Sequence, residues 1–178
     1  WSDSTQVPAD SRFISRHLFI PVIEPSDIQE VKDFVDLSFK LSRRSELYAG
    51  LVVTTNLADG GGTVHCRPNQ FPTLNMRHKM ELATAGINLD KRVLLPPRTW
   101  WQEEAFTERF ARAKAVAAEL GLNRIVYASA TRRPVGFVSS GLAYGYLVQS
   151  LHEMGQLGRW PILKLGMSYP VDERLVRE

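Results

Sequence analysis

The first part of the chain places short apolar runs on either side of one amphipathic stretch. The run 18-LFIPVI-23 predicts a buried strand. Apolar residues then recur at helical spacing and predict a helix that begins at 25-PSDIQ-29, where Ser26 and Gln29 can form a capping box. The segment 48-YAGLVVTTN-56 is rich in Val and Thr and predicts a second strand. This order predicts a parallel strand pair with a right-handed crossover.

The second part of the chain repeats this alternation. Helical spacing returns over residues 103–120 and ends at Gly121, a favourable C-terminal cap. The later segments fall into three predicted strands, 124–129, 135–140 and 161–167, a helix over 142–154, and a last helix that begins at Pro170. The fold class predicted from both parts is α/β, built from parallel-sheet units.

Three regions are predicted from these patterns. Residues 1–57 form one α/β domain, 58–102 a linker or long loop, and 103–178 a second α/β domain. Within the linker, 92-RVLL-95 predicts a strand, and the pair Trp100-Trp101 is expected to anchor the segment by burial.

Composition excludes several functional classes. The chain has 178 residues, a formal net charge of +3 and scattered basic pairs without a basic stripe, so nucleic-acid binding is not predicted. No apolar run approaches the ~20 residues of a membrane span. The one cysteine, Cys66, permits no intrachain disulfide and fits a reducing compartment, so a cytoplasmic protein is expected. A chain that starts at Trp1 and stops within 171-VDERLVRE-178 is expected to be a fragment.

The stretch 136-GFVSSGLAYGYLVQSLHEMG-155 is the first candidate site. Ser139, Ser140 and Gly141 stand where a strand gives way to a helix, so their N–H groups are placed to face an anion. The alternative is a turn that serves capping and packing. The alternative is favoured because neither a dinucleotide fingerprint nor a P-loop is present.

For the other candidate positions, the sequence gives less support for a functional role. Glu24 ends the first strand, where open α/β sheets bind ligands, although a capping carboxylate is the favoured interpretation. No metal site is predicted, because no C-x-x-C spacing accompanies Cys66. A Cys66 nucleophile with a histidine base has no supporting context. The remaining positions are interpreted as loop, surface or helix-terminal residues: the glycines at 60–62, His65, His78, His17, His152 and Glu103-Glu104.

Several phrases together resemble a known family. They are 3-DSTQVPADSR-12, 20-IPVIEPSDIQEVKDFVDLSFKLSR-43, 51-LVVTTNLADGGGTV-64, 94-LLPP-97, 121-GLNRI-125, 136-GFVSSGLAYGYLVQSL-151 and 162-ILKLGMSYPVDERLVRE-178. Their order and spacing resemble the indolepyruvate ferredoxin oxidoreductases, a branch of the 2-oxoacid:ferredoxin oxidoreductase family, notably the long bacterial type with fused subunits. The resemblance covers nearly the whole chain and is weakest between Cys66 and Val93.

The resemblance implies a thiamine diphosphate-dependent parent enzyme. Such enzymes convert aryl 2-oxoacids to acyl-CoA and CO2 and pass electrons through iron–sulfur clusters to ferredoxin. The chain would match the end of a pyrimidine-binding-like domain and the start of a transketolase C-terminal-like domain. Its partners would be the remainder of the parent enzyme and its dimer mate, with ferredoxin and CoA for the parent.

The resemblance also implies what the chain lacks. The G-D-G signature that precedes the Mg²⁺ and diphosphate site is absent, as are the cluster cysteines, so no catalytic residue and no cofactor are expected here. Ser4, Thr5 and Gln6 match a stretch near the family's active site. By this resemblance residues 136–155 have a structural role: Ser140 helps to cap the helix, and Gly141 permits the close return of the helix to the sheet. The alternative is a self-contained α/β binding or subunit-docking module that takes an anion after Gly141.

Overall fold

The computed structural model describes residues 10–69, 84–128, 131 and 133–177. The described residues group into two compact units. Unit 1 joins the residues up to Val64 with those from Arg109 onward, and unit 2 is His65–Glu108. The predicted division at residues 57/58 and 102/103 stays a prediction.

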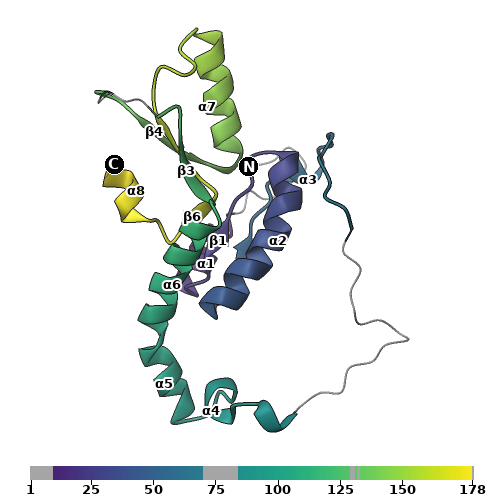
Figure 1. The fold of residues 1–178 in the computed structure, drawn as a ribbon, viewed down its shortest axis with the longest axis vertical. Helices are drawn as coiled ribbons and strands as arrows, with labels where there is room; N and C mark the ends of the chain where they lie inside the picture. Colours follow the sequence, from purple (N-terminus) through teal and green to yellow (C-terminus); the bar gives the residue numbers. More distant parts are fainter. Residues whose placement is uncertain (1–9, 70–83, 129–130, 132, 178) are drawn as a thin grey trace. The chain divides into compact units, whose positions relative to one another are not determined.

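Unit 1 holds two small sheets with helices around them (Figure 1). Its elements are α1 Arg12–His17, β1 Val22–Ile23, α2 Ile28–Ser45, β2 Gly50–Leu51, α3 Thr55–Ala58, most of α6 Phe106–Glu119, β3 Asn123–Val126, β4 Phe137–Ser140, α7 Gly141–Glu153, β5 Ile162–Leu165, β6 Met167–Tyr169 and α8 Glu173–Arg177. The predicted α/β fold class is thus confirmed at this level.

The first sheet has the strand order β2-β1-β6. β1 and β2 are parallel, with Val22 opposite Gly50 and Ile23 opposite Leu51, as the strand–helix–strand pattern predicted. β6 adds an antiparallel edge to β1. The expectation of a parallel sheet therefore holds for one strand pair, and β6, which arrives from the far end of the chain, makes this sheet mixed.

The second sheet, called sheet B below, has the order β3-β5-β4. β4 and β5 are parallel and are joined through α7, whereas β3 pairs with β5 in the antiparallel sense. Strand–helix–strand connections of this kind place the crossover helix on one face of the sheet. Sheet B is therefore mixed as well. The two specific domain types that the family resemblance implies stay predictions.

Helix α2 begins one residue later than the capping pattern predicted. Asp27 is the N-cap, and its carboxylate accepts the main-chain N–H of Glu30 at 2.8 Å. The Glu30 carboxylate reaches back to the N–H and hydroxyl of Ser26, at 2.9 and 2.8 Å. The predicted pair of Ser26 and Gln29 was wrong because Asp is as good an N-cap as Ser, and it places Glu30 at the reciprocal position.

The core of unit 1 lies where α2, α6 and the first sheet meet. Its buried members are Ile23, Phe34, Leu41, Ala113, Val116, Ala117, Leu122 and Met167. Gly166, between β5 and β6, joins the two sheets: its N–H donates to the Leu122 carbonyl, and its own carbonyl accepts from the Glu24 N–H. A side-chain carbon at Gly166 would lie 2.3 Å from the Leu122 carbonyl oxygen, so the position has room for glycine alone.

Unit 2 consists of short helical pieces. They are η1 Thr84–Gly86, α4 Leu89–Arg92 and α5 Arg98–Glu104. The strand predicted at residues 92–95 was wrong: Asn88 caps α4 by accepting the N–H of Lys91, which carries the chain into a helical turn. Burial of the tryptophan pair was wrong too, because Trp100 is 63% exposed and Trp101 45%.

Candidate functional site

The sequence candidates fall on different parts of the molecule. Ser4, Thr5, Gln6 and His78 lie outside the described residues. The other candidates can be placed. Ser139 and Ser140 end β4, Gly141 opens α7, and Glu24 directly follows β1.

The turn from β4 into α7 is built around Gly141. This residue has a φ of +52°, a left-handed conformation that favours glycine. Ser140 occupies the N-cap position in an extended conformation, but its side chain makes no capping hydrogen bond, so that predicted role was wrong. A side-chain carbon at Gly141 would lie 3.1 Å from Oε2 of Glu24. The predicted close approach at Gly141 is thus an approach to Glu24.

Glu24 is a buried carboxylate, only 5% exposed. Its Oε1 accepts a hydrogen bond from the hydroxyl of Ser168 on β6, and its Oε2 lies 3.4 Å from Nη1 of Arg12 on α1. The fold therefore brings together two sequence candidates, Glu24 and Gly141. The sequence carried no signal for Ser168 or Arg12, which reach the carboxylate through sheet pairing and helix packing.

This placement bears on anion binding at the α7 N-terminus. The partial positive charge of a helix N-terminus favours a nearby anion. The Glu24 carboxylate already lies against the first residue of α7 and is held there by Ser168. A second anion at Ser139–Gly141 would meet this carboxylate at short range. External anion binding at these residues stays a prediction.

A second polar cluster joins α2 to sheet B. Glu30, 8% exposed, forms an ion pair with Lys164 of β5, which is 2% exposed. Arg124 of β3, the register partner of Lys164, lies 3.3 Å from the same Glu30 oxygen. The Lys164 ammonium sits 4.4 Å from the centre of the Tyr144 ring.

The pKa values of Glu30 and Tyr144 in this cluster are shifted in opposite directions. Burial alone would raise the pKa of Glu30, but hydrogen bonds from Lys164 and Ser26 outweigh it, and the pKa is lowered from its ordinary value of 4.5. Burial, with the nearby phenol of Tyr127, raises the pKa of Tyr144. The cluster thus keeps Glu30 ionised between two cations, as expected of an interaction that links α2 to sheet B.

The described residues supply no ligand set for the metal centres that the family resemblance implies. Iron–sulfur clusters are typically held by about four cysteine thiolates, and the chain has one cysteine, Cys66, which is exposed. Among the described residues, no group of three or more His, Cys, Asp or Glu side chains is placed to hold a metal ion. Glu24 and Glu30, the buried glutamates of the two clusters, are each engaged with cationic side chains of the chain itself.

Comparison with known proteins gives one consistent result. No protein-family model matches the chain. Proteins named indolepyruvate oxidoreductase subunit IorA match 98% of it: those of Methanothermobacter marburgensis, Methanothermobacter thermautotrophicus and Pyrococcus horikoshii are 27%, 29% and 29% identical. The chain spans 27%, 27% and 26% of the length of these relatives. They are named as a subunit, so the fused arrangement stays a prediction.

Among the described residues, no helix combines the length and the hydropathy that a membrane-spanning segment requires. The motif-based resemblance is confirmed: over nearly its whole length the chain is similar to the indolepyruvate oxidoreductase subunit IorA, of which it spans about a quarter.

Proposed function

We propose that these residues belong to a thiamine diphosphate-dependent 2-oxoacid ferredoxin oxidoreductase that acts on aryl pyruvates and forms acyl-CoA and CO2. The observation that carries the proposal is the similarity to IorA over 98% of the chain. The iron–sulfur clusters bind elsewhere in the parent, because the chain has one cysteine. Thiamine diphosphate and Mg²⁺ also bind elsewhere, because the sequence lacks the G-D-G signature of their site. The parent works in the cytoplasm, a location that fits a single exposed cysteine.

Within the parent, these residues provide architecture and no catalytic group. Two buried carboxylates of unit 1, Glu24 and Glu30, support this role, because each is satisfied by side chains from other elements of the same unit. Buried charges are ordinarily paired, and the loss of one partner leaves the other uncompensated, so such pairs hold neighbouring elements together. The chain is therefore inert when isolated, and its parent requires the dimer mate, ferredoxin and CoA. The anion-binding alternative has weaker support because Glu24 already lies beside Gly141.

The test uses the complete protein whose reading frame contains these residues. Purified without oxygen, it is expected to reduce ferredoxin or methyl viologen when given indolepyruvate and CoA, and to do so only with thiamine diphosphate and Mg²⁺ bound. Titration calorimetry of the isolated 178-residue chain with thiamine diphosphate is expected to show no binding. A complete protein without 2-oxoacid oxidation, or tight binding by the isolated chain, would count against the proposal.

Site variants in the complete protein separate the two candidate positions. Gln6→Ala is expected to raise the KM for the 2-oxoacid, because the family resemblance places residues 4–6 near the active site. Ser139→Ala is the matched control and is expected to leave both kcat and KM unchanged. The opposite pattern would move the functional role to the turn before α7.

A further inference from the structure

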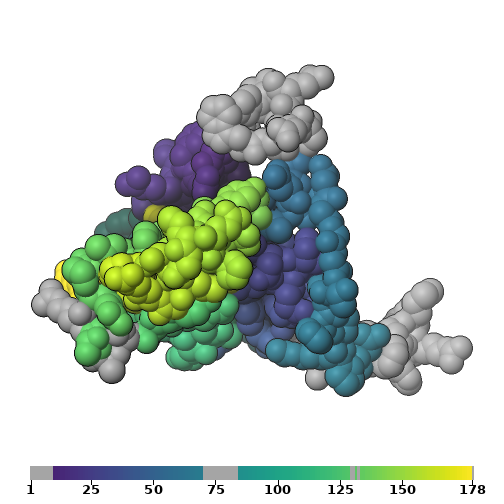
Figure 2. Space-filling model, turned by 90° about the horizontal axis from the view of Figure 1, so that it is seen from above, coloured from purple at the N-terminus to yellow at the C-terminus, as the bar shows by residue number. Residues whose placement is uncertain are grey.

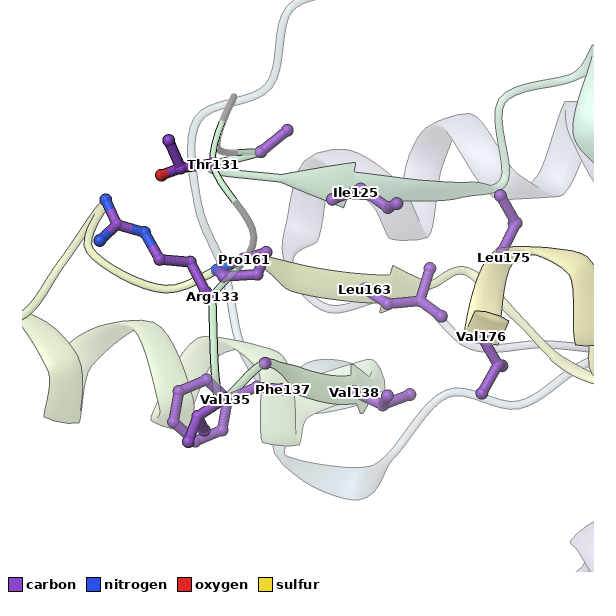
Figure 3. Close-up of a pocket in the computed structure, with 12 residues that line it drawn as sticks. Ile125, Thr131, Arg133, Val135, Phe137, Val138, Pro161, Leu163, Leu175 and Val176 are labelled. Carbon is purple, nitrogen blue, oxygen red and sulfur yellow. The ribbon is translucent and has the colours of Figure 1, made fainter. Parts of the chain in front are cut away.

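We draw no further inference here: the strongest candidate, the open pocket of about 440 Å³ lined by Val138 and Leu163 of sheet B and by Val176 of α8 (Figure 3), lies on the face of the sheet away from α7, the helix whose outer surface Figure 2 shows in yellow-green, and nothing in the structure shows what covers that face.

Discussion

Replacing Lys164 with methionine is expected to weaken unit 1 severely. The substitution keeps the length and apolar stem of the side chain but removes its ammonium group. Glu30, in the first turn of α2 and 8% exposed, would then be without its principal cation. Two interactions would remain at the carboxylate: the hydrogen bonds from Ser26, at 2.8 and 2.9 Å, and the pair with Arg124 at 3.3 Å.

The expected loss in the free energy of unfolding depends on the contacts that remain at the Glu30 carboxylate. Breaking a buried ion pair from one side costs about 3–5 kcal/mol of the free energy of unfolding, because an uncompensated charge stays buried. Arg124 is half exposed and close to Glu30, so Lys164→Met is expected at the lower end, about 3 kcal/mol. Adding Glu30→Gln removes the stranded charge and is expected to recover about 1–2 kcal/mol.

Urea unfolding followed by circular dichroism measures these differences. Lys40→Met is the matched control: Lys40 also pairs with a carboxylate, Asp36 at 2.6 Å, but on the exposed side of α2. Its expected cost is below about 0.5 kcal/mol. If Lys164→Met cost no more than Lys40→Met, or if Glu30→Gln deepened the loss instead of reversing it, the pair would not join α2 to sheet B.

Three further predictions concern the protonation of Glu30, the close packing at Gly166 and the backbone at Gly141. The pKa of Glu30 is lowered in the folded protein, so its carboxylate stabilises the fold at pH values above the ordinary pKa of 4.5. In urea titrations the native protein is therefore expected to be more stable than Glu30→Gln above this pH. That difference in the free energy of unfolding is expected to disappear as the pH falls through the lowered pKa. Gly166→Ala is expected to lower the free energy of unfolding by at least about 1–3 kcal/mol, because a side-chain carbon there would clash. Gly145→Ala, in a helix with open space around it, is expected to raise the free energy of unfolding by about 0.5–1 kcal/mol. Equal effects in thermal unfolding would contradict the close contact at Gly166. Gly141→Ala is expected to cost about 1–2 kcal/mol for its left-handed backbone, and no change in the melting temperature would refute that conformation.

Local patterns predicted the parts of the fold that depend on neighbouring residues. The parallel pair β1–β2, helix α2 and the β4–α7–β5 crossover all follow from apolar periodicity, and all are present. The errors lie where several local solutions have similar free energies. Asp27 competes with Ser26 as the N-cap, and residues 89–92 form a capped helical turn beside the predicted strand. The antiparallel strands β3 and β6 depend on distant pairing partners, which periodicity does not report.

In the candidate site, too, local sequence patterns identified individual residues but could not predict the contacts between them. The sequence marked Glu24 at a strand end and Gly141 at a helix start, and each received a favoured structural interpretation by itself. Their contact depends on the pairing of β1 with β6, which also brings the Ser168 hydroxyl to the carboxylate across 144 positions of sequence. A helix N-terminus that attracts an anion accepts a carboxylate of its own chain as readily as a ligand, because the field is the same for both. The motif alone therefore cannot separate binding from architecture, and the buried partners of Glu24 favour architecture here.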